Sequence, residues 1–160
     1  MTRDYGELRV RPARLEDAAA LAPILRAADL QEIAASSGRP PLEVLEDGLR
    51  HSPAPYAAAL SDGTVVALLG VAPTATPELG AVWLLGSDHL STHRLTFLRH
   101  SREWLRILFA DYQLLGNLVD ARNTLHVAWL RWMGFRFLRR VAIGQNGEEF
   151  IEFVRLREDL

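Results

Sequence analysis

Two carboxylates and three histidines are the candidates for proton-transfer chemistry in this sequence. Asp29 and Glu32 stand three residues apart near the end of a segment with helical periodicity. His89 and His93 are spaced by four residues, and His126 lies in a later apolar segment. Carboxylates and imidazoles are common general bases in enzymes. A lone histidine is more often a structural residue than a catalyst, so the histidines are the weaker candidates.

Several other kinds of site are excluded or disfavoured. The chain has no cysteine, which excludes disulfides, thiolate zinc sites and a cysteine nucleophile. Ser36-Ser37-Gly38 has the composition of a loop and lacks the Gly-x-Ser-x-Gly pattern of a nucleophile elbow. Two histidines four residues apart can bind one metal ion when both lie on a formed helix. Here the residues between His89 and His93 are expected only to begin a helix, so the spacing is weak support for a metal site. We therefore predict no metal site.

The composition is that of one folded domain covering residues 1–160. Hydrophobic residues make up 49% of the chain, enough for a sizeable core. A net charge of −2 gives no electrostatic case for binding nucleic acid. There is no apolar run of about 18 residues for a membrane span and no apolar stretch of a signal peptide at the start. We therefore expect the protein to be located in the cytoplasm, or in a virus particle assembled there.

The first half of the chain predicts two helices and three strands. An apolar stripe with acidic residues in its first turn predicts a helix over Leu15–Ala28. A second helix begins at Pro41, a residue that suits the first helical turn. Alternating or continuous apolar residues predict strands over Glu7–Arg11, Tyr56–Leu60 and Val65–Ala72.

The second half predicts strands that alternate with helices. The longest helix runs from Ser91 or Thr92 to Ala110, with Leu95, Leu98, Trp104, Leu105 and Leu108 as core candidates. A mixed sheet with helices on both faces accommodates hairpins followed by strand–helix–strand units. The predicted elements are strands at Ala81–Leu85, Leu118–Asp120, Phe135–Val141 and Phe150–Arg155, and a helix at Thr124–Met133.

The stretch from Asn123 to Phe135 resembles the GNAT superfamily of acyl-CoA N-acyltransferases, in which an Asn, a helix and Gly-Phe occur at this spacing. Asn123 is suited to cap the helix, Gly134 to end it in the left-handed conformation, and Phe135 to enter the core. The opening Arg9–Arg14 also looks like a GNAT start. The resemblance implies an α/β (α+β) fold with a mixed, mostly antiparallel central sheet flanked by helices on both faces.

The resemblance also implies a reaction, the transfer of an acetyl group from acetyl-CoA to a small amine or a protein acceptor. Glu32 is the first choice for catalysis, because GNAT acceptor sites often form near the end of the first helix. The strand around Leu84 would bind the pantetheine arm, two arginines would bind the phosphates, and an asparagine would line the channel. The implied cofactor-binding residues are Leu85, Gly86, Ser87, Arg94, Arg99 and Asn123.

Two positions depart from the GNAT pattern. The segment from Gly86 to Arg94, which corresponds to the glycine-rich phosphate loop, has a single glycine and carries Asp88. Ser91 and Thr92 remain possible phosphate donors at the start of the helix. Leu130 stands where many GNAT enzymes have a tyrosine that protonates the leaving thiolate. Loss of a general acid typically lowers the rate by about 100- to 10,000-fold.

A narrower resemblance covers almost the whole chain. Trp83–Asp88, Phe97–Ser101 and Asn117–Asn123 are similar to segments of an uncharacterised bacteriophage and prophage family, which is related to the internal virion protein of T7-like phages. This resemblance implies a phage or prophage origin and possible virion partners. It leaves a second hypothesis beside the enzyme: a non-catalytic GNAT-like protein acting as a virion component or host-interaction factor.

Overall fold

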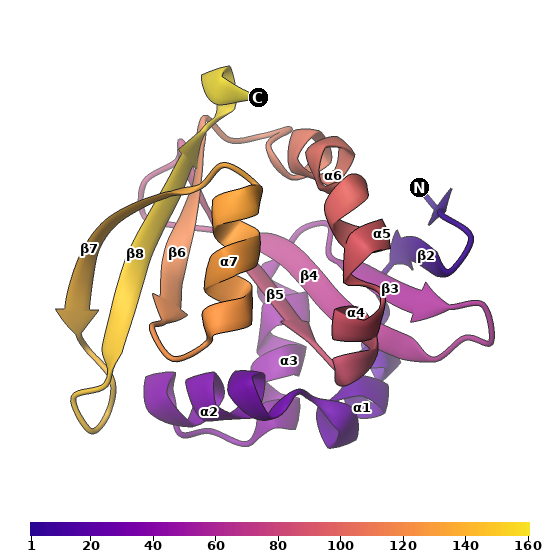
Figure 1. Ribbon diagram of the computed structural model, residues 1–160, viewed down its shortest axis with the longest axis horizontal. Coiled ribbons are helices and arrows are strands. Elements are labelled where there is room, and N and C mark those ends of the chain that lie inside the picture. The colour runs from indigo at the N-terminus through magenta and orange to yellow at the C-terminus, as the bar shows by residue number, and fades with distance from the viewer.

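A computed structural model describes residues 1–160 and shows one eight-stranded sheet with helices packed on both faces (Figure 1). The strand order is β1-β2-β3-β4-β5-β6-β8-β7, and β5 and β6 are the only parallel neighbours. The predicted fold class is therefore confirmed. The strands are β1 (Arg3–Asp4), β2 (Leu8–Pro12), β3 (Tyr56–Leu60), β4 (Val65–Pro73), β5 (Leu79–Gly86), β6 (Leu114–Asp120), β7 (Arg136–Ala142) and β8 (Glu149–Leu156).

The helices divide between the two faces of the sheet. One face packs against α1 (Glu16–Leu21), α2 (Ala27–Ser36) and α3 (Pro41–His51), whose buried apolar side chains form one cluster with Leu68 of β4. The other face packs against the helices that follow β5 and β6 (Figure 1). These are α4 (Asp88–Thr92), α5 (Arg94–Arg99), α6 (Ser101–Leu108) and α7 (Thr124–Trp132). No helix in the structure combines the length and apolar character needed to cross a bilayer.

The parallel strands β5 and β6 separate after a short paired segment. Their register covers only Leu79–Ala81 against Leu114–Gly116, although both strands continue for several residues. At the point of separation the Asn117 side chain donates from Nδ2 to the Val82 carbonyl oxygen at 3.0 Å. A gap therefore opens in the middle of the sheet, between the carboxyl ends of β5 and β6.

The predicted helix over Leu15–Ala28 is wrong. α1 ends at Leu21 and is followed by a short 3₁₀ turn, Ala22–Ile24. Leu25 then adopts an extended conformation and forms an isolated bridge with Ser87. Pro23 has no N–H to continue the helical hydrogen bonds, which accounts for the break. The next helix, α2, consequently starts in a new direction and runs across the lower end of the sheet (Figure 1).

The predicted long helix from Ser91 or Thr92 to Ala110 is also wrong. Three short helices replace it, with interruptions at His93 and His100, and the first is capped by the side chain of Ser87. Leu95 is 71% exposed and so is not a core residue, whereas Trp104 and Leu105 are buried as predicted. The strand predicted at Leu118–Asp120 is longer and starts at Leu114.

The end of α7 follows the sequence prediction closely. Gly134 has a φ of +82° and terminates the helix in the left-handed region. Phe135 is buried, and its ring packs edge-on against Phe153 with 5.3 Å between centroids. Trp129 is buried as expected of one of the two tryptophans on this helix, and Trp132 is 70% exposed.

Candidate functional site

Helix α2 closes the open end of the gap between β5 and β6. The Asp29 carboxylate accepts the backbone N–H of Gly86, the last residue of β5, at 2.9 Å. One turn later, the Glu32 carboxylate accepts the backbone N–H of Asp120, the last residue of β6, at 2.5 Å. Each carboxylate thus occupies the end of one strand, and the helix bridges the two.

A buried polar network surrounds Asp29. Arg26 donates from Nη2 to Asp29 Oδ1 at 2.7 Å, and Asn123 donates from Nδ2 to the same oxygen at 3.0 Å. The guanidinium also lies 5.5 Å from the centre of the Trp129 ring. Asn123 occupies the N-cap position of α7, but because its side chain is used here it makes no capping bond, and that part of the prediction is wrong. Asn123 instead fastens the start of α7 to α2.

A cavity of about 350 Å³ lies at the gap and reaches both faces of the sheet. Val82 and Leu84 contribute from β5, Leu118 from β6, and Leu130 from α7. Of its 24 lining residues 19 are hydrophobic, so the few polar side chains define its chemistry. Those polar residues are Glu32, Ser36, Ser101, Asn117 and His126.

Glu32 is the charged side chain of this cavity. Burial is the main cause that raises its pKa to about 7, and the nearby Asp29 carboxylate adds to the effect. The hydrogen bond from the Asp120 N–H opposes the rise by stabilising the anion. A carboxyl group with a pKa near neutrality exchanges a proton readily at physiological pH, as a general base must.

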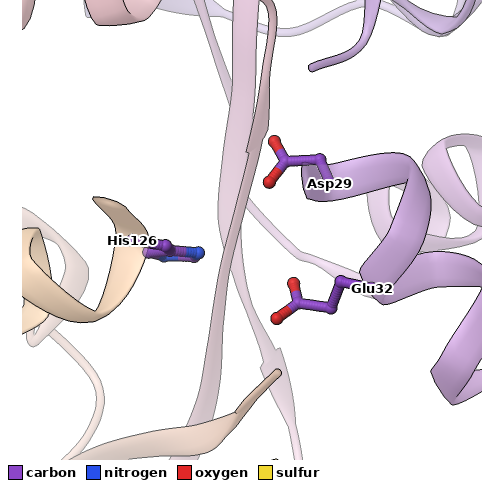
Figure 2. Close-up of side chains that lie close together, drawn as sticks. All are labelled: Asp29, Glu32 and His126. Atoms are coloured by element: carbon purple, nitrogen blue, oxygen red, sulfur yellow. The ribbon is translucent and has the colours of Figure 1, made fainter. Parts of the chain in front are cut away.

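His126 approaches the same space from the opposite side. Figure 2 shows its ring directed from α7 toward the two carboxylates of α2. Its Nδ1 atom is buried and has no hydrogen-bond partner. Burial lowers the pKa of His126 to about 4, with Asp29 acting in the opposite direction, so the ring is neutral at pH 7. A neutral imidazole beside Glu32 leaves the carboxylate without a cationic partner in the cavity.

Asp29 and Glu32 lie one turn apart on α2, and only the fold brings the distant His126 beside them, so the cluster has no signature in the sequence. Ligand atoms of Asp29, Glu32 and His126 all lie within 4.8 Å of one another, a grouping that can hold a metal ion. Asp29, however, already accepts hydrogen bonds on both oxygens and pairs with Arg26. A bound cation would have to displace these donors and face a guanidinium, so the residues present do not fit a metal.

Backbone alternation determines which groups of β5 face the gap. Ser87 donates its N–H to the Val66 carbonyl of β4 at 2.9 Å, and its side chain caps α4. Alternate residues direct their backbone groups to opposite sides, so Leu85 also faces β4, whereas Leu84 and Gly86 face the gap. The Gly86 N–H binds Asp29, and its carbonyl accepts the Arg26 N–H at 2.9 Å. The peptide groups of Leu84 therefore remain directed into the gap.

The structure places the two predicted phosphate-binding arginines apart from this network. Arg94 is exposed and donates to the Ser91 carbonyl at 3.3 Å. Arg99 lines an adjoining surface hollow with Trp132, the last residue of α7, whereas Asn123 precedes the first turn of that helix. That helix of nine residues is about 13 Å long. Ser91 and Thr92 lie within α4 and not at its start, so their predicted place at the helix N-terminus is wrong.

Comparison with known sequences gives no relative. No protein-family model matches the chain, and no curated protein matches it.

Solved structures do match, over nearly the full length. A probable acetyltransferase of the GNAT family from Chromobacterium violaceum has a TM-score of 0.72 at 15% identity, covering 97% of this chain and 85% of that one. Ribosomal-protein-S5-alanine acetyltransferase from Vibrio fischeri has 0.67 at 13%, covering 99% and 98%. A GNAT-family acetyltransferase from Bacillus anthracis has 0.64 at 10%, covering 99% of both. The chain therefore has the fold of the GNAT acetyltransferases.

Proposed function

We propose that this protein is an acyl-CoA-dependent N-acyltransferase in which Glu32 is the general base. One observation carries the proposal: a carboxyl group with a pKa of about 7 lies in an apolar cavity, at the point where the parallel strands separate. The GNAT fold and the resemblance of Asn123–Phe135 to that superfamily support acetyl-CoA as the donor.

The reaction would join an amine to the acyl carbon of a thioester. For a neutral amine the new C–N bond forms, the C–S bond breaks, and one proton moves from nitrogen to sulfur overall; an acceptor that arrives as an ammonium first releases one further proton to solvent. The nitrogen becomes more acidic as it bonds to the acyl carbon, and Glu32 accepts the proton at that stage. The cavity contributes by holding the reactants together and excluding water, a positioning effect that can be large.

Residues of β5 and α5 would hold the donor, which supplies the activated thioester. The Leu84 peptide groups face the gap and would bind the pantetheine arm. Leu85 and Gly86 end that strand and Ser87 follows it, although Gly86 is already hydrogen-bonded to Arg26 and Asp29. The exposed Arg94 would pair with a phosphate. A place in the cytoplasm of a host cell is consistent with this role.

A second candidate is a non-catalytic phage protein that keeps the GNAT scaffold as a virion component or host-interaction factor. Two observations favour it. The backbone of Gly86 is occupied from within the protein, and Leu130, which lines the cavity, offers no proton-transfer group. The phage or prophage origin that the resemblance of Asn117–Asn123 implies belongs to this hypothesis. A fold can persist after its original chemistry is lost.

Calorimetric titration with acetyl-CoA separates the two candidates. An enzyme should bind acetyl-CoA, and Glu32→Gln should keep that binding while turnover falls by about 100-fold or more. If millimolar acetyl-CoA gives no heat of binding, the acyltransferase hypothesis is wrong and the non-catalytic GNAT-like protein remains. The chain has no lysine, so acetylation of its own lysines cannot produce background turnover.

A further inference from the structure

We infer that the acceptor is an apolar monoamine that carries no carboxylate or phosphate group. This inference rests on the proposed function, because it names the substrate class of the same cavity. It depends on which charged side chains line the cavity and on the absence of any cationic side chain from that lining.

Glu32 is the only charged residue among those lining the cavity. No arginine lines it, and the protein contains no lysine. The nearest buried cation is Arg26, whose guanidinium pairs with Asp29, bonds to Asn123 and stacks on Trp129. Arg26 is thus committed to the closing network and is not available to a ligand.

This distribution selects one positive charge on the ligand. An ammonium entering the cavity can pair with Glu32, which has no other cationic partner there. A ligand carboxylate or phosphate would lose its hydration without gaining a cation, which is strongly unfavourable. The second ammonium of a polyamine would meet a similar penalty, because the lining has no second carboxylate.

The side chains around Glu32 suit an acceptor amine whose remaining atoms are apolar. Ile33, Val44 and Trp83 line the cavity on the α2 and α3 side. Leu118 and Ile143 also line it and are 36% and 56% exposed, so apolar side chains continue outward from the cavity to the surface. Exposed apolar side chains beside a pocket are typical of the entrance for an apolar ligand. A cavity of about 350 Å³ accommodates a small arylalkylamine.

Binding should follow the ionisation of Glu32. The ammonium pairs with the carboxylate and not with the neutral acid. Since burial raises the pKa of Glu32 to about 7, affinity should increase as pH rises from 6 to 8, where a simple alkylamine stays protonated. An apolar alcohol of the same shape should show no such dependence.

The test measures binding in the absence of any acyl donor, by calorimetry and thermal shift. The probes are phenethylamine, phenylalanine, which adds one carboxylate, 2-phenylethanol, which lacks the charge, and spermidine. Phenethylamine should bind at least about tenfold more tightly than the other three at pH 8. Glu32→Gln should lose this preference. Glu16→Gln, which changes an exposed carboxylate on α1 that does not line the cavity, should retain it.

The inference is overturned if phenylalanine or spermidine binds as tightly as phenethylamine, or if Glu32→Gln leaves phenethylamine binding unchanged. The two proposals can fail separately. If the protein binds phenethylamine selectively but does not bind acetyl-CoA, the proposed ligand class is supported and the proposed acyltransferase function is wrong. If the protein binds acetyl-CoA and acetylates an anionic or polycationic amine, the acyltransferase function is supported and the proposed ligand class is wrong.

Discussion

Asp29 and Glu32 lie one turn apart on α2, and each carboxylate holds the terminal backbone N–H of a different strand across the open gap. Their surroundings differ. Asp29 is fully buried and pairs with Arg26, whereas Glu32 faces an apolar cavity with no cationic partner. The same helix therefore supplies one carboxylate that is paired within the fold and one that faces the cavity.

Removing the structural carboxylate should destabilise the fold strongly. Asp29→Ala leaves the Arg26 guanidinium buried without its partner, and breaking a buried ion pair in this way typically costs about 3–5 kcal/mol. Urea denaturation should show the loss. Asp47→Ala, which removes the exposed partner of Arg39, is the matched control and should leave the midpoint unchanged. Equal effects of the two substitutions would contradict the assigned role of Asp29.

The raised pKa of Glu32 predicts a stability change with a definite sign. The native carboxyl keeps its proton up to about pH 7, whereas the unfolded one loses it near 4.5. Between these values the native state binds more protons, so the free energy of unfolding falls as pH rises. Glu32→Gln removes this penalty and should stabilise the protein by about 1–3 kcal/mol at pH 8, with little change at pH 4. Equal stability of both proteins at pH 8 would argue against a buried, raised Glu32.

His126 predicts the opposite slope. Its pKa is lowered to about 4 in the native state, against 6.5 when unfolded, so the native state binds fewer protons between these values. Stability should therefore increase as pH rises from 4 to 6.5. Between pH 4.5 and 6.5 this slope opposes that of Glu32. Denaturation series should show His126→Gln losing stability with rising pH and Glu32→Gln gaining it. His51→Gln, at an exposed histidine, should follow the wild type.

Two glycines allow the close contact at the end of α7 to be measured. Gly134 and Gly147 both have positive φ, of +82° and +79°. A Cβ on Gly134 would lie 2.8 Å from Arg155 Nη1, whereas one on Gly147 meets nothing within 4 Å. Both alanine variants carry backbone strain of about 1 kcal/mol. Gly134→Ala should lose clearly more stability in urea denaturation, because Arg155, which donates to the Met133 carbonyl, must also move. If both variants lose the same free energy of unfolding, the Arg155 side chain moves aside at no measurable cost.

Several elements were predicted correctly because a local signal determines them, although the local break at Pro23 was missed. Gly134 ends α7 and Phe135 enters the core because a left-handed residue and a buried aromatic act within a few residues. Tyr56–Leu60 forms a strand with the predicted bounds. The mixed sheet followed from the order of such elements.

The site was only partly predictable, because its contacts join distant segments. Glu32 was selected through a family resemblance, and the structure adds its cavity and its bond to Asp120. The partner of Asn123 could not be foreseen, since an asparagine before a helix normally caps it, and here Asp29 competes successfully for the side chain. His126 gave no local signal that separates it from an ordinary structural histidine.

Position 130 provides a gain-of-function test of the enzyme hypothesis. Leu130 is buried, lines the cavity and lies one turn beyond His126 on α7, at the position where the GNAT resemblance places a tyrosine. Leu130→Tyr would direct a hydroxyl group toward the cavity and supply a proton donor. Since general acids typically contribute about 100- to 10,000-fold, turnover with acetyl-CoA and an amine should rise at least about tenfold. Leu130→Phe adds the same ring without the hydroxyl and should give no increase. If the two variants have equal turnover, protonation of the leaving group does not limit the rate, and Leu130 ceases to count against the enzyme.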